Sequence, residues 1–210
     1  MDPPRRQVSL AGSTLHPSCH ACAFFNDREE EYRVLLPFSG EGLRQGDKIF
    51  QIVEAGHRAE RLQRLAGLGV DVPAAEQSGQ IEVRRWEDAQ LRDRRFDQFA
   101  MLDLVAEVLG TAKNNFPLTR FWANMEWALS DFPGVEDIVE YESRLNHMMT
   151  KFDDVVVCAY DLKKFSAAVV VDVLRTHPQV IIGGTLQENP FYIVPERFLA
   201  ELQARRTPAG

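Results

Sequence analysis

Residues 19–32 read C-H-A-C-A-F-F-N-D-R-E-E-E-Y and predict a short buried strand, 21–25, that runs straight into a helix. In nucleotide-binding α/β proteins the first turn between strand and helix is rich in glycine, because backbone amides must approach phosphates closely. Here the turn has no glycine and no P-loop lysine, and Glu29, Glu30 and Glu31 would repel a phosphate. The stretch predicts an α/β domain that begins like a nucleotide-binding fold but does not bind ATP or GTP.

Working outward from this stretch, strands and helices are expected to alternate. Apolar runs typical of strands follow at 48–53, 81–86, the start of 118–129 and 155–160, with short terminal strands at 180–182 and 191–194. Helical spacing or capping residues predict helices from residue 27, at 57–68, 96–109, 135–152, 166–176 and 195–202. This order predicts a doubly wound, mostly parallel sheet with helices on both faces and a short antiparallel edge near the C-terminus.

Proline and glycine mark the expected boundaries. Residues 1–18 contain scattered prolines and are expected to be a mobile lead-in, too short for a helix-turn-helix. Residues 19–202 are expected to form a single domain and residues 203–210 a tail. Pro37, Gly40 and Gly42 interrupt the first helix, so a kink or a break is expected there.

Composition excludes several classes of protein. The chain has 210 residues, 45% hydrophobic and 26% charged, as in a soluble globular domain. Its net charge of -7 argues against a nucleic-acid-binding surface. No apolar run of about 18 residues and no signal peptide are apparent, so no membrane association is expected and the protein is expected to be cytoplasmic, with its three cysteines reduced.

A series of short motifs resembles the MEDS family. These are H-A-C-A-F-F-N-D-R-E-E-E-Y from His20, L-L-P-F, E-G-L, G-D-K, H-R, W-A-N-M-E-W-A from Trp122, C-A-Y-D, T-H-P and N-P-F-Y. In that family they belong to the sensory domain of dichloromethane-responsive repressor-type regulators and of histidine kinases from methanogens and methylotrophs. The resemblance spans residues 20–195 and implies a RecA/KaiC-like core without a P-loop. It also implies a ligand drawn from hydrocarbon derivatives or related small organic molecules.

Acidic and aromatic side chains follow several predicted strands, at the edge where open α/β sheets bind ligands. Glu54, Glu126 and Tyr160 lie at such ends and are candidate ligand-binding residues. Asp27 and Asp161 lie there too, but their simplest interpretation is that they cap the helices that follow. Trp122, on the fourth strand, is a candidate for the aromatic wall of a small-molecule cavity, or simply for the core.

Glu142 is the most informative single residue, because it falls on the apolar stripe of the helix expected at 135–152. A carboxylate there is costly unless it is paired or hydrogen-bonded. Either Glu142 lies at the edge of the stripe and reaches solvent, or it lines a polar spot with Asn146, one turn later, and with Glu126 as a neighbour. A cavity bordered by the carboxyl ends of the strands, with Glu126 and Glu142 facing it, is the predicted site.

His20 and Cys22 are two residues apart and should share one face of the first strand, while Cys19 points away. Thiolates and imidazoles suit zinc, but no second C-x-x-C or H-x-x-x-H completes a four-ligand set, so neither a metal nor another cofactor is predicted. His20 and Cys22 either contribute to a pocket wall or are simply buried. Cys158 is expected to be buried and inert. His177, at a helix end, either complements the helix dipole or contributes to the pocket.

No G-x-S-x-G, H-E-x-x-H or phosphate loop is present, so catalysis is not predicted. The preferred interpretation is a non-enzymatic sensor domain that binds a small organic ligand and signals to a histidine kinase or transcription regulator. The alternative is a ligand-free interaction module, derived from a RecA-like ATPase, that acts on such a partner. No direct binding to nucleic acid is expected, and self-association is left open.

Overall fold

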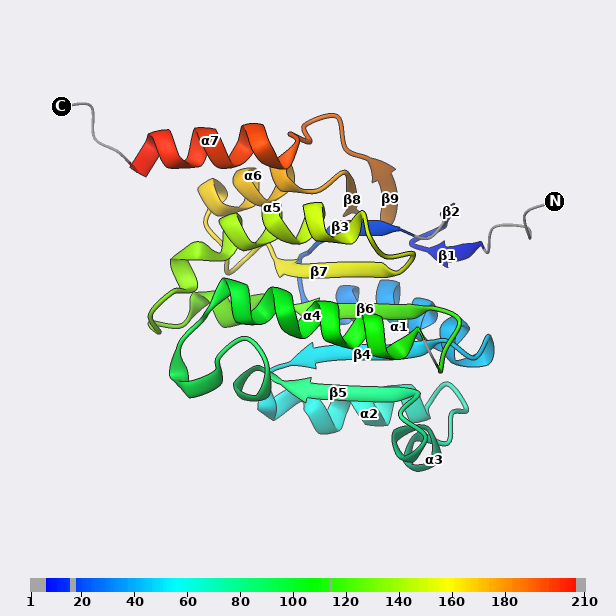
Figure 1. Ribbon diagram of the computed structural model, residues 1–210. Coiled ribbons are helices and arrows are strands. Elements are labelled where there is room, and N and C mark those ends of the chain that lie inside the picture. The colour runs from blue at the N-terminus through cyan, green and yellow to red at the C-terminus, as the bar shows by residue number, and fades with distance from the viewer. Residues whose placement is uncertain (1–6, 16–17, 114, 207–210) are drawn as a thin grey trace.

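The computed structural model describes residues 7–15, 18–113 and 115–206. A seven-stranded sheet of order β5-β4-β6-β7-β3-β8-β9 forms its centre (Figure 1). All neighbouring strands are parallel except the edge pair β8 and β9, so the predicted doubly wound sheet with a short antiparallel edge is confirmed. The strands are β3 Cys19–Phe25, β4 Lys48–Val53, β5 Ile81–Arg85, β6 Thr119–Asn124, β7 Val155–Asp161, β8 Gln179–Ile182 and β9 Thr185–Glu188.

Helices cover both faces of the sheet. One face packs against α4 Gln98–Ala112, α5 Ile138–Met149, α6 Ala167–Thr176 and α7 Pro195–Arg206, and the other against α1 Arg28–Arg44, α2 Arg58–Ala66 and α3 Val72–Gln77 (Figure 1). Because side chains alternate along each strand, Cys22 and Cys158 point to the α5 face, while Cys19 and Trp122 point to the α1 face. Each face therefore has its own apolar core.

The turn after β3 closes on itself. The Asp27 carboxylate accepts from the backbone N–H of Glu30 at 2.9 Å, and the Glu30 carboxylate accepts from the N–H of Asn26 at 2.8 Å. These two bonds resemble a capping box, with Glu30 reaching the residue before the N-cap, and they satisfy amides that a phosphate would otherwise use. The interpretation of Asp27 as a helix cap is confirmed.

The sequence predicted a kink or a break in the first helix, and the break is wrong, because α1 continues from Arg28 to Arg44 through Pro37. Its buried face packs against the sheet and holds the helix together despite the hydrogen bond that proline removes. Gly42 serves close packing: a Cβ there would lie 2.6 Å from Cδ of Arg120. The glycine marks a close approach of strand and helix and not an interruption.

Part of the expected mobile lead-in is ordered. β1 Val8–Leu10 and β2 Ser13–Leu15 form an antiparallel hairpin whose apolar side chains join the core on the α1 face. The turn uses positive φ at Ala11 and Gly12, as two-residue hairpins require. Residues 1–6 and 16–17 of this segment lie outside the described residues. At the other end α7 extends to Arg206, into the expected tail, whose residues 207–210 are also outside them.

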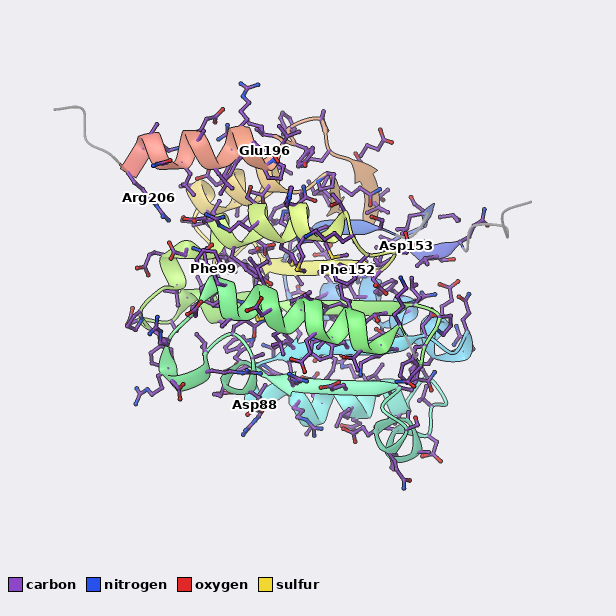
Figure 2. All side chains as sticks on the ribbon, viewed as in Figure 1. Asp88, Phe99, Phe152, Asp153, Glu196 and Arg206 are labelled. Atoms are coloured by element: carbon purple, nitrogen blue, oxygen red, sulfur yellow. The ribbon has the colours of Figure 1, made fainter. Side chains whose placement is uncertain are left out.

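The last strand is not at 191–194 as predicted but at Thr185–Glu188. Gly183 and Gly184 have φ values of 59° and 74°, which permits a tight two-residue turn directly after β8. The chain then loops through Tyr192 into α7. Figure 2 shows Glu196 near the start of α7 and Arg206 at its far end, where Arg206 donates to Glu140 of α5 at 2.8 Å. Within the described residues, no helix has the length and apolarity needed to cross a membrane.

Candidate functional site

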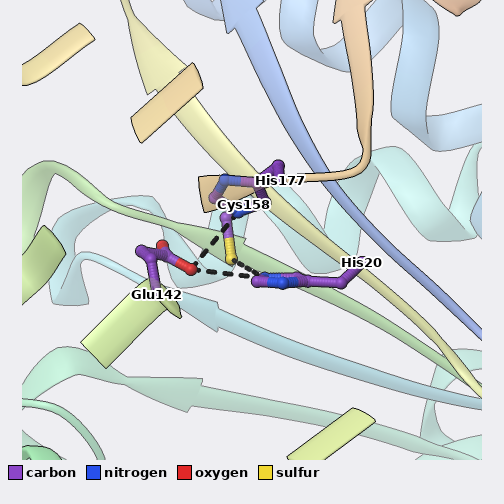
Figure 3. Close-up of side chains that lie close together, drawn as sticks. All are labelled: His20, Glu142, Cys158 and His177. Atoms are coloured by element: carbon purple, nitrogen blue, oxygen red, sulfur yellow. Dashed lines mark hydrogen bonds and ion pairs between the residues drawn. The ribbon is translucent and has the colours of Figure 1, made fainter. Parts of the chain in front are cut away.

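Four buried side chains on the α5 face converge: His20, Glu142, Cys158 and His177 (Figure 3). We call them the His–Cys cluster. One potential ligand atom from each lies within 4.8 Å of all the others. Oε2 of Glu142 lies 3.2 Å from Nε2 of His20 and 3.3 Å from Nε2 of His177, and Sγ of Cys158 lies 3.6 Å from Nε2 of His20.

The sheet and α5 bring the first three of these side chains together. β3 and β7 are adjacent parallel strands with Cys22 opposite Cys158, so His20 and Cys158 project from the same face. Glu142 lies on the buried stripe of α5 between Ile138 and Leu145, which directs its carboxylate at the sheet. The exposed fraction of Glu142 is 0%, so the alternative in which it reaches solvent is wrong.

His177 is oriented by the end of α6. Pro178 follows it and disfavours further helix, so His177 leaves the helical conformation. The carbonyl of Val173 therefore lacks its helical partner and instead meets the Nδ1 of His177 at 2.8 Å. If Nδ1–H donates to this carbonyl, Nε2 faces the cluster with its lone pair or a second proton.

Tyr160 fixes the other side of the Glu142 carboxylate. Its hydroxyl donates to Oε1 at 2.5 Å, while Oε2 has no hydrogen-bond partner among the described residues. Burial raises the pKa of the Tyr160 hydroxyl well above its usual value, so the phenol stays a donor. The result is a carboxylate with one oxygen held and one oxygen aimed at two imidazoles.

The electrostatics of the cluster favour a charged carboxylate. Burial raises the pKa of Glu142, but the His177 and His20 imidazoles together hold it well below its usual range. Burial and the nearby His177 lower the pKa of His20 to about 4. Burial also opposes a charge on His177, yet Cys22 and Glu142 beside it raise its pKa well above the ordinary histidine value. Without another cation, one proton on His177 balances Glu142.

A surface hollow leads to the cluster. It has a volume of roughly 370 Å³, and its lining includes His20, Asn146, Pro178, Tyr192 and Glu196. The amide of Asn146 donates to the Tyr192 hydroxyl at 2.5 Å, which closes part of its floor. His20 is 2% exposed, so the imidazole separates the hollow from the rest of the cluster. A small molecule or an ion that enters here meets His20 first.

Three of the candidate residues lie elsewhere. Glu54 is half exposed and pairs with His57, and Glu126 pairs with Lys164 at 2.5 Å. Trp122 lies on the opposite face, where its indole N–H donates to Glu31 at 2.8 Å. The predicted pocket at the carboxyl ends of the strands, shared by Glu126 and Glu142, is therefore wrong.

The site is on the sheet face instead, near the amino ends of β3 and β8. His20 is the second residue of β3, and His177 precedes β8. α6 runs antiparallel to the strands, so its last residues return to their amino ends. Cys22 lies next to the cluster on β3, and Asn146 lies at its rim.

Sequence reasoning missed Cys158, which was expected to be buried and inert. It is buried, but its sulfur faces His20. The signal that could have found it is its register with Cys22, which becomes visible only once β3 and β7 are known to be neighbours.

Solved structures with similar folds show which architecture this chain has. A KaiC-like protein of Pyrococcus horikoshii OT3 superposes with a TM-score of 0.59 at 14% identity, covering 84% of this chain and 80% of that one. The flagellar accessory protein FlaH of Methanocaldococcus jannaschii gives a TM-score of 0.57 at 11% identity, covering 87% and 84%. At this level of identity the likeness shows a RecA-like α/β fold alone.

Sequence comparison is more specific. The transcriptional repressor DcmR of Methylorubrum extorquens is 27% identical over 174 residues, which are 81% of this chain and 62% of the repressor. The chain thus matches less than two thirds of that relative's length. The profile of the MEDS family, the methanogen/methylotroph DcmR sensory domain, matches residues 19–178 and so includes every member of the His–Cys cluster. The chain therefore belongs to the MEDS family of sensory domains.

Proposed function

We propose that this chain is a non-enzymatic sensor whose input site is the His–Cys cluster together with the hollow above it. The observation that carries the proposal is the hollow of roughly 370 Å³ that ends on His20, because it joins a buried polar cluster to the surface. Membership in a sensory-domain family supports the regulatory role. Oε2 of Glu142 adds support, because it is buried beside two imidazoles and has no hydrogen bond of acceptable geometry among the described residues.

The ligand class follows from the size and lining of the hollow. Pro178, Tyr192, Val194 and Pro195 provide apolar walls, and Asn146 and His20 provide polar groups at the inner end. A small organic molecule with one polar group fits this pattern, and a hydrocarbon derivative is the class that the family resemblance implies. The signal that a ligand is bound would be passed to a partner regulator, such as a histidine kinase or a transcription regulator.

The proposal is tested by following amide shifts of isotope-labelled protein while small halogenated and oxygenated hydrocarbons are added. Saturable shifts are expected at residues that line the hollow, such as Asn146 and Tyr192. Asn146→Leu removes the amide at the inner end and should weaken binding about tenfold, equivalent to about 1.4 kcal/mol. Phe99→Ala is the matched control, because Phe99 lines a neighbouring hollow between α4, α5 and α7 and is not among the residues that line the hollow above His20. Equal losses in both variants, or no saturable shift, would refute the site.

The second candidate, a ligand-free interaction module, is favoured by that neighbouring hollow. Phe99, labelled in Figure 2, is 59% exposed. Leu102, Met148 and Leu199 line the same hollow and extend its apolar surface. Exposed aromatic surface of this kind occurs at protein interfaces. Loss of partner binding in Phe99→Ala, with no ligand detected at the His–Cys cluster, would favour the interaction module over the sensor.

A further inference from the structure

We infer that the His–Cys cluster is a tetrahedral metal site for zinc, with Nε2 of His20, Nε2 of His177, Oε2 of Glu142 and Sγ of Cys158 as ligands. The inference goes beyond the proposed sensor function and does not depend on it. All four side chains are buried, and each offers an atom of a type that binds zinc.

The distances match a tetrahedron. Bonds of about 2.0–2.1 Å from zinc to nitrogen or oxygen put two such ligands about 3.3 Å apart, and a sulfur at about 2.3 Å lies about 3.6 Å from a nitrogen. The Glu142 oxygen lies 3.2 and 3.3 Å from the two imidazole nitrogens, and the Cys158 sulfur lies 3.6 Å from His20. The remaining pairs lie within 4.8 Å, so small side-chain rotations complete the site.

Internal hydrogen bonds do not explain this convergence. Oε2 of Glu142 and Nε2 of His177 are 3.3 Å apart, yet in residues 7–15, 18–113 and 115–206 neither has a hydrogen-bond partner with acceptable geometry. Nε2 of His20 approaches the same oxygen at 3.2 Å. Buried polar atoms without partners are uncommon in proteins, and here two of them face a common centre. A cation at that centre gives both atoms a partner.

Outer contacts orient the ligands as they do in metal sites. The carbonyl of Val173 meets Nδ1 of His177 and leaves Nε2 to the cluster, and the Tyr160 hydroxyl holds Oε1 of Glu142 and leaves Oε2. Metal-bound histidines and carboxylates in proteins usually have such partners. Asn146 lies near His20 on the side of the hollow, which provides the route of entry.

The charges favour a divalent ion of borderline softness. One thiolate and one carboxylate contribute two negative charges, which a dication balances to zero, and a neutral group is the least costly to bury. Two imidazoles with one sulfur and one oxygen in tetrahedral geometry suit zinc, whereas magnesium and calcium prefer oxygen ligands in larger number. A proton on His177 would balance Glu142 alone and would leave the thiol uncharged, so metal analysis separates the two arrangements.

The test uses the full chain, purified with and without chelator and then titrated with Co²⁺ as a spectroscopic substitute for zinc. We expect one metal per chain, visible absorption typical of tetrahedral cobalt, and a near-ultraviolet charge-transfer band from a cobalt–thiolate bond. Cys158→Ser should abolish that band, and Glu142→Gln should weaken binding about 10- to 100-fold or more.

Cys19→Ser is the matched control, because Cys19 is an equally buried thiol that points to the opposite face. It should keep the charge-transfer band, and circular dichroism checks that each variant is folded. Substoichiometric metal, an octahedral cobalt spectrum, or equal losses in Cys19→Ser and Cys158→Ser would overturn the inference. Tyr160→Phe, which keeps all four ligands, should retain the band with weaker affinity, so the inference remains testable if Cys158→Ser does not fold.

The two proposals fail separately. Metal binding without amide shifts from any organic molecule would leave the metal site standing and refute the small-molecule input. Organic ligand binding to metal-free protein, unaffected by added zinc, would leave the small-molecule input standing and refute the metal site.

Discussion

Two buried polar clusters lie on opposite faces of the sheet and are built in opposite ways. On the α1 face, the guanidinium of Arg120 donates to Asp47 at 2.8 Å, to Glu41 at 2.7 Å, to the Phe38 carbonyl at 2.8 Å and to Gln45 at 3.1 Å. We call these residues the Arg120 cluster. Its donors meet acceptors within the protein, as a buried charge requires.

In the His–Cys cluster, the Glu142 carboxylate faces two imidazoles and a thiol. Its Oε2 lies 3.2 Å and 3.3 Å from Nε2 of His20 and His177, and it has no hydrogen bond of acceptable geometry within the described part of the chain. The comparison teaches that burial of charge alone does not mark a functional site, since both clusters are buried. What distinguishes them is the group at the centre: the Arg120 guanidinium donates to carboxylate, amide and carbonyl oxygens around it, whereas the His–Cys cluster requires a proton or an added cation.

The largest change in stability is expected from removing the guanidinium of the Arg120 cluster. Arg120→Met should lower the free energy of unfolding by about 3–5 kcal/mol, because it leaves the Asp47 carboxylate buried without its guanidinium. Urea unfolding measures this loss. Arg84→Met is the control, because Arg84 pairs with Glu82 at the surface and should cost about 1 kcal/mol or less. Similar losses in the two variants would contradict the comparison.

The second largest change in stability is expected when zinc binds to the His–Cys cluster. Zinc at a hundredfold excess over its dissociation constant should raise the free energy of unfolding by about 2.7 kcal/mol. The gain should be small in Glu142→Gln, which loses a ligand charge. Arg120→Met should keep the full gain although its starting stability is lower. Urea unfolding with zinc and with chelator provides the measurement, and an undiminished gain in Glu142→Gln would count against the metal site.

A third variant tests the close packing of α1 beside the Arg120 cluster. Gly42→Ala places a Cβ 2.6 Å from Arg120 and 2.9 Å from Ile49, so overpacking should cost about 1–3 kcal/mol. Gly110→Ala, in α4, where no atom of the described residues lies within 4 Å of the added Cβ, should instead stabilise by about 0.5–1 kcal/mol. Thermal unfolding of both variants decides the matter: a destabilised Gly110→Ala, or a neutral Gly42→Ala, would show that the packing is looser than described.

The smallest loss of stability is expected when a carboxylate outside both clusters is replaced. Glu126→Gln removes one partner of the Lys164 pair, whose side chains are 43% and 11% exposed, and should cost about 1 kcal/mol or less. It should leave cobalt spectra and ligand-induced amide shifts unchanged. Altered cobalt binding in this variant would bring Glu126 back into the site.

The sequence predicted the sheet well and the details of its surroundings less well. The strand at 48–53 matches β4, because a continuous apolar run is a local property. The helix break at Pro37 failed because packing of α1 against the sheet outweighs a local preference. The hairpin at Val8–Leu10 and Ser13–Leu15 was missed because its apolar residues gain their burial from elements distant in sequence.

For the site, alternation along a strand places His20 and Cys22 on one face and Cys19 on the other, and the structure has this arrangement. Glu142 stood out because a charge interrupts an apolar stripe. His177 was a candidate pocket residue from its place at a helix end. No local pattern indicates that Cys158 and His177 lie beside Glu142, since that depends on strand order. For the same reason, the rule that ligands gather at carboxyl ends of strands misplaced the pocket.

The wide spacing of the cluster along the chain has a kinetic consequence. Cys158 and His20 are 138 positions apart in sequence, and the four residues come from β3, α5, β7 and the segment after α6. An ion held by all four ties the first strand of the sheet to its last crossover and closes a long loop, whose entropic cost is met when the chain folds. Contacts so far apart in sequence are costly to close early in folding, so we expect the bound ion to slow unfolding more than it speeds folding. The bound ion would then act as a non-covalent cross-link between distant parts of the domain, and release of the ion would loosen β3, α5 and α6 together.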